Sequence, residues 1–166
     1  MPIHRYVTDL RLIAATDGSA LESRGAAGWA WFIDSDNWDA GGLRHGTAQQ
    51  AELLAILFLL QATPPHVPLH ILSDSTYAIS ACTRWRFNWR KRDWVPTSNK
   101  KVVNLNVMKD LDEELTGRLV TFEWIKGHSG HPMNSQADMM CGHASLAVQR
   151  GRGFGPHGPG LTGEVA

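Results

Sequence analysis

Apolar residues recur along this chain in short runs, and the first part of the chain reads as strands. Residues 10–16 and 28–33 predict two strands, and the second is apolar on both faces, so we expect it to be covered on both. Residues 34–39 predict a hairpin turn, and residues 42–45 a weak third strand. The chain therefore begins with a group of three strands.

Beyond residue 46, longer apolar runs with helical spacing alternate with short ones. The run at 47–62 is apolar nearly all round, which predicts a buried helix. The helix at 102–115 is amphipathic and should point Asp112, Glu113 and Glu114 outward. The other predicted elements are a strand at 67–73, a helix from 76 to about 85, a strand at 119–125, a Gly- and His-rich loop at 126–132 and a last helix at 134–149. This order predicts an α/β fold, a mixed sheet flanked by helices.

The length and composition fit one domain. Of the 166 residues 43% are apolar, which is enough for a core; we place the domain at 1–150 and a flexible Gly- and Pro-rich tail at 151–166. The formal net charge is zero, so any affinity for nucleic acid must come from a local patch. The two cysteines form no CxxC pair, and no segment is typical of a signal peptide or a membrane span. We therefore expect a cytoplasmic protein with no membrane partner.

Four acidic residues stand where predicted elements begin or end. Asp17 follows the first strand, Asp74 ends the strand at 67–73, and Glu52 and Asp138 lie in the first turns of their helices. Each has a simpler explanation taken alone. These explanations are a turn at Asp17-Gly18, a charge favoured by the helix dipole at Glu52, a cap at Asp74-Ser75 and a capping box at Ser135-x-x-Asp138.

Together, the four acids favour a metal site. Ligand sites in sheets with crossover helices gather at strand ends, and carboxylates that converge there cannot all stay ionised without cations. Oxygen ligands select hard cations such as Mg²⁺ or Mn²⁺. Two such ions about 4 Å apart can activate an attacking water and stabilise the leaving oxygen of a phosphodiester. The pattern therefore points to phosphate chemistry.

Cations and indoles are concentrated in residues 83–94, in an otherwise neutral chain. Arginine and lysine neutralise backbone phosphates, and aromatic faces pack on sugars or bases, so the block is typical of a nucleic-acid contact. The alternative is a helix with its tryptophans inward, because Trp85 and Trp89 have the i, i+4 spacing of a buried face. Both descriptions are compatible if the indoles anchor a protrusion that displays cations.

Several motifs resemble the type 1 ribonuclease H family in order and spacing, over about residues 10–149. They are Thr16-Asp17-Gly18-Ser19, Ala51-Glu52-Leu53, Ser73-Asp74-Ser75 and Gly127-His128-Ser129-Gly130-His131-Pro132-x-Asn134-x-x-x-Asp138. The resemblance implies a ribonuclease H-like fold with a five-stranded mixed sheet, three antiparallel strands being followed by parallel ones. It also implies that a monomer cleaves the RNA strand of RNA–DNA hybrids, leaving 5′-phosphate and 3′-hydroxyl ends.

The resemblance further implies roles for individual residues. Two Mg²⁺ ions, with Mn²⁺ as a substitute, would be held by Asp17, Glu52, Asp74 and Asp138, and His128 would assist proton transfer or product release. Thr47 and Asn104 match the family's pocket for a phosphate of the DNA strand, and the block at 83–94 resembles its basic protrusion. The expected substrate contacts are Gly18, Ser19, Thr47, Gln49, Trp85, Asn88, Trp89, Arg90, Lys91, Arg92, Trp94 and Asn104.

The chain departs from the family pattern at some contact positions. Ser23 stands where the family tends to have asparagine, and residues 48–50 are Ala-Gln-Gln in place of Asn-Asn-Arg. Gln49 can still donate a hydrogen bond to a ribose 2′-hydroxyl, the group that distinguishes RNA from DNA. His45 replaces a commonly basic position near the phosphate pocket.

Three alternatives remain open from the sequence. One is a resolvase or integrase that acts on DNA with the same fold, and another is a binding module in which the acids serve only turns and caps. The third is a zinc site, since histidine and cysteine suit zinc, although the spacing matches no common finger. Its ligands would be His128, His131, Cys141 and His143.

Overall fold

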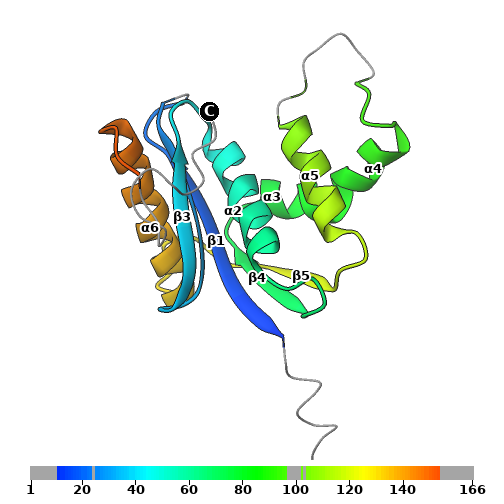
Figure 1. Cartoon of the computed structure of the whole chain (residues 1–166), viewed down its shortest axis with the longest axis horizontal. Helices are drawn as coiled ribbons and strands as arrows, with labels where there is room; N and C mark the ends of the chain where they lie inside the picture. Colours follow the sequence, from blue (N-terminus) through cyan, green and yellow to red (C-terminus); the bar gives the residue numbers. More distant parts are fainter. Residues whose placement is uncertain (1–10, 24, 97–101, 103, 154–166) are drawn as a thin grey trace, which may run out of the picture.

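The computed structural model describes residues 11–23, 25–96, 102 and 104–153. Most of the predicted tail, residues 154–166, lies outside this part of the chain. The described residues form a single sheet with helices on both faces (Figure 1).

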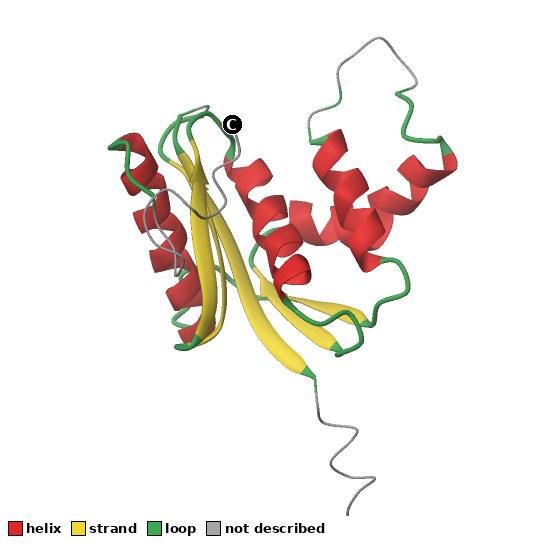
Figure 2. Ribbon diagram, viewed as in Figure 1, coloured by secondary structure: helices red, strands yellow, loops and turns green. Residues whose placement is uncertain are grey.

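The sheet has five strands in the order β3-β2-β1-β4-β5 (Figure 2). The antiparallel part consists of β1 (Leu12–Ala20), β2 (Ala27–Asp34) and β3 (Asn37–Leu43). The parallel part continues from β1 to β4 (Leu69–Ser73) and β5 (Val120–Trp124). The predicted α/β fold with a five-stranded mixed sheet is confirmed.

Two long helices cover opposite faces of this sheet (Figure 1). One face carries α6 (Pro132–Gln149), and the other carries α2 (Ala48–Ala62). Beyond α2 lie α3 (Thr76–Ser80), the π-helical segment η1 (Ala81–Trp85), α4 (Arg86–Lys91) and α5 (Leu105–Leu115). None of the helices in the described residues has the length and apolar character needed to cross a membrane.

The main hydrophobic core lies between α2 and the sheet. Leu53, Ile56 and Leu59 of α2 are completely buried in the same cluster as Trp29 and Ile71 of the strands. The side of α2 that turns away from the sheet packs against α5, so no face of the helix is left to solvent along most of its length. This arrangement explains why the sequence of α2 is apolar nearly all round, and the predicted buried helix is confirmed.

The hairpin between β2 and β3 is tighter than its sequence predicts. The turn has only two residues, Ser35 and Asp36, and the predicted turn at 34–39 and strand at 42–45 are wrong in extent. The side chain of Asp34 accepts hydrogen bonds from the main-chain nitrogen of Asp36 at 2.9 Å and from Asn37 at 2.8 Å. These bonds stabilise the tight turn, so β2 and β3 already pair at Asp34 and Asn37, the residues on either side of it.

Two helix boundaries also differ from the predictions. The helix expected to end near Trp85 continues through η1 into α4, so the chain stays helical as far as Lys91. The helix expected from residue 102 begins only at Leu105, because the residue before it, Asn104, has a left-handed backbone conformation with φ of 66°. Neither feature changes the hydrophobic pattern, which is why the sequence did not reveal it.

Close contact between α6 and the sheet depends on Gly28. A Cβ atom there would lie 2.0 Å from the main-chain oxygen of Cys141 and 2.7 Å from the main-chain nitrogen of Ser145. Both atoms belong to the helix backbone, so only a shift of α6 could make room. The small residues Ala30, Ala40 and Ala144 complete this contact.

We predict that Gly28→Ala lowers the free energy of unfolding by about 3 kcal/mol or more, at or above the usual cost of overpacking, because helix backbone is a rigid neighbour. Denaturant unfolding measures the loss. The matched control is Gly142→Ala within α6, where an added Cβ meets nothing within 4 Å. That control should gain about 0.5–1 kcal/mol from helix propensity. Equal stability of Gly28→Ala and the original chain would contradict the close-packing argument.

Candidate active site

Asp17 lies inside β1, so the prediction that it follows the strand is wrong, and the alternative explanation of Asp17-Gly18 as a turn is excluded. It pairs with Ala30 of β2, which extends the antiparallel ladder to Ala20. On the other side, β4 pairs with β1 only as far as Thr16 and Ser73. Asp17 is therefore the first residue of β1 beyond the carboxyl end of β4, and it is only 4% exposed.

Glu52 lies in the second turn of α2, so the first-turn position expected for it is wrong. The helix begins after Thr47, whose side chain accepts a hydrogen bond from the main-chain nitrogen of Gln50 at 3.0 Å. Glu52 is 8% exposed, because α2 approaches β1 closely at Gly18. A Cβ atom on Gly18 would lie 2.4 Å from the main-chain nitrogen of Glu52. The role that the structure shows for Gly18 is this close approach.

Asp74 follows β4 directly, as predicted, and it does not cap the next helix. Ser75 does so instead, accepting a hydrogen bond from the main-chain nitrogen of Ala78 at 3.0 Å. The Asp74 carboxylate lies against the loop after β5, where a Cβ atom on Gly127 would be 2.6 Å from its Oδ2. The main-chain oxygen of Asp74 accepts a hydrogen bond from Trp124 at 3.1 Å. The side chain of Asp74 thus serves no helix cap and lies with the other acids.

Asp138 lies in the second turn of α6, because the helix begins at Pro132, two residues earlier than predicted. The first-turn position expected for Asp138 is therefore wrong, and the alternative explanation of Ser135 and Asp138 as a capping box is excluded. The Asp138 carboxylate lies 3.6 Å from Nδ1 of His128, whose side chain is 81% exposed and whose backbone is left-handed with φ of 55°. The structure thus places His128 at the solvent side of Asp138.

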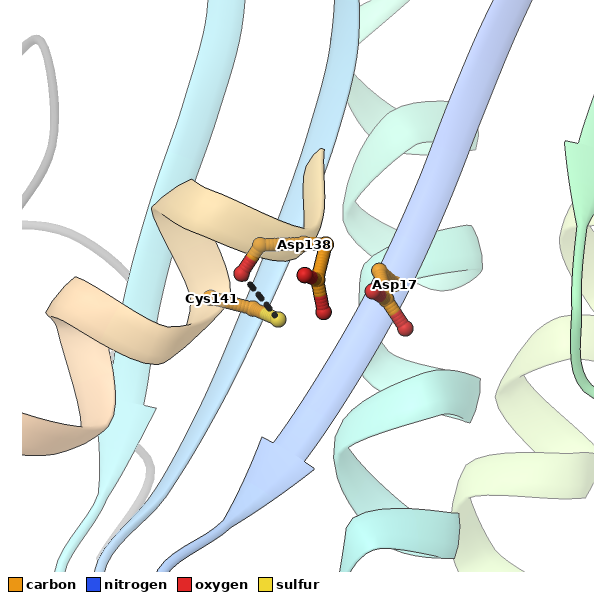
Figure 3. Close-up of side chains that lie close together, drawn as sticks. All are labelled: Asp17, Asp138 and Cys141. Atoms are coloured by element: carbon orange, nitrogen blue, oxygen red, sulfur yellow. Dashed lines mark hydrogen bonds between the residues drawn. The ribbon is translucent and has the colours of Figure 1, made fainter. Parts of the chain in front are cut away.

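The four carboxylates meet around Asp17. Oxygen atoms of Asp17, Glu52 and Asp74 lie within 4.8 Å of one another, and so do ligand atoms of Asp17, Asp138 and Cys141. Figure 3 shows Asp138 and Cys141 on α6 facing Asp17 on β1. Sequence reasoning missed Cys141 as a neighbour of the acids. Its i+3 spacing from Asp138 on a helix could have indicated a shared face.

Burial and mutual repulsion raise the pKa values of this cluster. Burial raises the pKa of Asp17 from its ordinary 3.8 to about 7; a hydrogen bond with Glu52 works against this, and the charge of Asp74 adds to it. Burial and the charge of Asp17 also raise the pKa of Glu52, and burial with the charge of Asp138 raises that of Asp74. One oxygen of Glu52, Oε2, is buried with no hydrogen-bond partner in the described structure.

These features fit divalent cations. Buried carboxylates with raised pKa values, an unpartnered oxygen and a group of donors made of carboxylate oxygens alone, on Asp17, Glu52 and Asp74, are conditions that a hard cation relieves. The predicted alternative of a zinc site finds no support among residues 11–23, 25–96, 102 and 104–153. The groups there that are close enough to share an ion include neither His128, His131 nor His143, and Cys141 joins the acids instead.

Comparisons with known proteins agree with this geometry. The family model described as RNase H matches residues 9–145. The chain belongs to the ribonuclease H family. It is 39% identical over 163 residues to a ribonuclease H of Tropheryma whipplei (strain Twist), with 94% of this chain and 97% of that protein covered. It is 38% identical over 146 residues to ribonuclease HI of Streptomyces coelicolor, covering 84% of this chain and 63% of the relative.

A solved structure supports the fold separately. It is described as LC9-RNase H1, a type 1 RNase H with the type 2 active-site motif, and it superimposes with a TM-score of 0.71. The alignment covers 90% of this chain and 77% of that one at 18% identity, so it bears on the fold alone. The family model and the curated relatives identify this chain as a ribonuclease H enzyme.

In this ribonuclease H, the tryptophans of the basic block anchor it to the core. Trp85 packs edge-on against Tyr77 with ring centroids 5.2 Å apart, and Trp85, Trp89 and Trp94 all contact the main core cluster while remaining half-buried. The predicted alternative, a helix with its tryptophans turned inward, is therefore correct for much of the surface of these side chains. The rest of Trp85 and Trp89 lines an open pocket of about 190 Å³ with Asn88 and Arg92.

Asp112 is buried, so the prediction that it points outward is wrong. It is 6% exposed and accepts hydrogen bonds from Arg86 at 2.8 Å and from Arg90 at 2.9 and 2.5 Å. Burial alone would raise the pKa of Asp112, but the two arginines hold it below its ordinary value. Arg90, expected to contact the DNA strand, is thus tied to α5. Lys91 and Arg92 remain exposed.

The other expected contact residues fall into two groups. Thr47 and Asn104 line one pocket of about 770 Å³, together with His45, Gln50 and Asn106, although they are distant in sequence. Asn104 donates a hydrogen bond to the hydroxyl of Tyr77 at 3.2 Å, which fixes its side chain at the rim. Gln49 is exposed in the first turn of α2, and Ser19 is half-buried on β1 beyond Asp17.

The raised pKa of Asp17 predicts how the metal-free protein responds to pH. The folded state keeps the Asp17 proton up to about pH 7, whereas the unfolded chain releases it near 3.8, so this group's contribution to stability falls across that interval and is constant above it. Asp17→Asn should remove that fall. In chelator at pH 8 it should raise Tm by about 3 °C or more, the change that 1 kcal/mol produces in a domain of this size.

Thermal unfolding with and without Mg²⁺ tests this prediction. Adding Mg²⁺ at pH 8 should stabilise the original chain more than Asp17→Asn, because cations bind the folded state only where the carboxylates are intact. The matched control is Asp110→Asn on the exposed side of α5. A variant at position 17 that is less stable than the original chain at pH 8 would contradict the electrostatic argument.

Proposed function

We propose that this enzyme hydrolyses the RNA strand of RNA–DNA hybrids with two divalent cations, Mg²⁺ or its substitute Mn²⁺, leaving 5′-phosphate and 3′-hydroxyl ends. The observation that carries the proposal is the convergence of four carboxylates on Asp17, with one buried oxygen of Glu52 unpartnered. The family membership supports the same reaction. Asp17, Glu52, Asp74 and Asp138 would hold the cations.

The positions of the four acids suggest a division of labour. Asp17 is common to both groups of ligand atoms, so it would serve both cations, with Glu52 and Asp74 on one side and Asp138 on the other. Cations bound there would activate the attacking water and stabilise charge on the leaving oxygen. The protein's own part is to hold the carboxylates rigidly on β1, β4, α2 and α6 before substrate arrives.

His128 would move protons at the open side of this site. Its ring lies 3.6 Å from Asp138 and is exposed, so it would stand between solvent and a phosphate bound at the carboxylates. Its backbone is left-handed, and its ring faces Asp138 of α6. We propose an accessory role for it in proton transfer or product release.

The basic block and the pocket beside α5 would hold the DNA strand. Lys91 and Arg92 are exposed cations at the end of α4, and the pocket with Asn88 presents aromatic and polar groups together. Thr47 and Asn104 would bind a phosphate of the same strand in the larger pocket. Gln49, one turn before Glu52, would donate to a ribose 2′-hydroxyl of the RNA strand.

The reaction is tested with labelled RNA–DNA hybrid, duplex DNA and duplex RNA, each with Mg²⁺ and with chelator. We expect Mg²⁺-dependent loss of RNA from the hybrid alone, and a fall of kcat by about 100-fold or more in Asp74→Asn, because a lost cation ligand removes stabilisation of several kcal/mol. Asp110→Asn serves as the exposed control. Cleavage of duplex DNA would favour the resolvase alternative, and hybrid binding without cleavage would favour a binding module.

The Asp112 contacts predict that neighbouring cations have different roles. Replacing Lys91 and Arg92 together by glutamine should weaken hybrid binding and lower its salt slope by about 2, since each phosphate contact releases about one counterion. Thermal stability should stay nearly unchanged. Arg90→Gln should instead lower the Tm measurably, because it leaves the buried Asp112 carboxylate short of donors. Affinity at several salt concentrations, measured beside thermal unfolding, separates the two roles, and identical profiles for both variants would contradict the assignment.

A further inference from the structure

Trp124 is a large aromatic side chain that is exposed beside the acids. It is the last residue of β5, it pairs in register with Ser73 on β4, and it is 54% exposed. Its indole nitrogen donates a hydrogen bond to the main-chain oxygen of Asp74 at 3.1 Å. Asp74 carries one of the carboxylates that meet at Asp17. The indole is therefore attached directly to the main chain of one of the four acids.

The orientation of this indole is the reverse of the usual one at a protein surface. A surface tryptophan ordinarily packs its apolar ring inward and keeps its polar N–H group near water. In Trp124 the N–H group is bonded to the protein, while more than half of the residue is exposed. Because indole has no other polar group, the surface that it presents to solvent is apolar. The side chain thus offers a flat apolar face in a restricted orientation, and ordering such a ring on binding costs little conformational entropy.

Alternation along β5 places this ring on the same side of the sheet as α2 and the basic block. Val120 and Phe122 both pack against the main core cluster, which includes residues of α2. Side chains two positions apart in a strand face the same side, so Trp124 faces that side as well. The contacts that α3 makes with β4 and β5 agree with this placement, and Figure 1 shows α3 and α4 on the same side.

The exposed ring lies at the acid end of this side, far from the exposed cations. The helical run of α3, η1 and α4 begins at Thr76, two residues after Asp74, and ends at Lys91. At the usual rise of 1.5 Å per residue this run is about 24 Å long. The cations of the protrusion and the ring of Trp124 would therefore contact different parts of a bound nucleic acid. In the proposed reaction, the strand next to Asp74 is the RNA strand.

We propose that Trp124 packs its exposed face against a ribose of the RNA strand, within about two nucleotides of the cleaved phosphate, since the phosphates of one strand follow each other about every 3.4 Å along a duplex. The assignment rests on the proposed function, because that function places the RNA strand over the acids. Bases within a duplex are stacked on one another, so a ring that approaches from outside meets sugars. The contact would hold the RNA strand in place over the carboxylates.

Substitutions at position 124 test the contact through hybrid affinity. Trp124→Ala should weaken hybrid binding about fivefold, the lower end of what aromatic contacts with nucleotides contribute, and should raise KM more than it lowers kcat. Trp124→Phe keeps a ring without the N–H group and should retain most of the affinity. The matched control is Leu119→Ala, an exposed apolar side chain just before β5, which should bind like the original chain. Anisotropy titrations with Ca²⁺ in place of Mg²⁺ measure affinity, and the RNA is checked for integrity after each one.

A cleavage map identifies the nucleotide that the ring contacts. The RNA strand carries a propyl spacer in place of one nucleotide, and end-labelled products of single cuts give the cleavage rate at every bond. In the original chain the spacer should slow cleavage at fixed distances from itself, because it removes a ribose. At one of these distances, at most about two nucleotides, the slowing should disappear in Trp124→Ala and persist in Leu119→Ala, because a contact that is already absent cannot be lost again. An abasic ribonucleotide, which keeps the sugar, should not reproduce the Trp124-dependent slowing.

The outcomes separate this contact from the proposed reaction. Unchanged affinity in Trp124→Ala, an equal loss in Trp124→Phe, or a slowing that Trp124→Ala does not relieve would overturn the contact and leave hybrid cleavage intact. Spacers in the DNA strand should reveal no dependence on Trp124, and a dependence there would overturn the assignment to the RNA strand. Affinity that depends on Trp124 in a protein that does not cleave hybrids would support the aromatic contact and overturn the proposed function. Thermal unfolding confirms that each variant is folded, and Trp124→Leu replaces Trp124→Ala if it is not.

Discussion

Uncompensated negative charge in a confined space is the constraint around which this protein is organised. Asp17 and Glu52 are both buried, Asp74 and Asp138 face them, and burial with mutual repulsion raises the pKa values of Asp17, Glu52 and Asp74. A fold selected for stability alone would separate these groups or pair them with cationic side chains. Keeping them together, with a carboxylate oxygen unpartnered, makes sense if cations complete the site.

Two glycines impose this arrangement from opposite faces of the sheet. Gly18 lets the backbone of α2 approach β1, which buries Glu52 beside Asp17, and Gly28 lets α6 approach β2, which carries Asp138 over the same strand. The register of β1 with β4 then puts Asp74 next to Asp17. The geometry of the site is therefore set by backbone contacts between elements, and the rest of the core serves to hold those elements rigid.

The sequence predicted the identity of the four acids better than their local settings. Hydrophobic runs revealed the order of the elements, and the order of the motifs revealed the family. Asp17, Glu52 and Asp138 nonetheless lie inside their elements, because strand pairing and helix starts extend beyond what the apolar pattern shows. This correction removes the simpler explanations, since residues within a strand or a second helical turn serve neither turns nor caps.

Two features depended on tertiary contacts and had no strong local signal. Asp112 stands in an acidic run on an amphipathic helix, which indicates an exposed face, and only the approach of α4 shows that Arg86 and Arg90 enclose it. In the sequence, Cys141 looks like an ordinary small core residue, and only the fold shows that Asp17 lies opposite it. In both cases a partner lies more than 20 residues away in the sequence. The spacing of Cys141 along α6 could indicate only its shared face with Asp138, not the approach of Asp17.

The formal net charge of zero hides a separation of charge that matters for binding. Sixteen basic and sixteen acidic residues balance over the whole chain, yet Lys91 and Arg92 stand exposed on α4 while four acids crowd the end of β4. A polyanion is therefore attracted at the protrusion and repelled at the carboxylates until cations occupy them. Salt concentration should chiefly affect binding at the protrusion, and divalent ions should chiefly affect binding at the carboxylates. If the proposed function holds, a strand held at the protrusion would extend across the acids only once cations occupy them, which would couple substrate placement to metal binding.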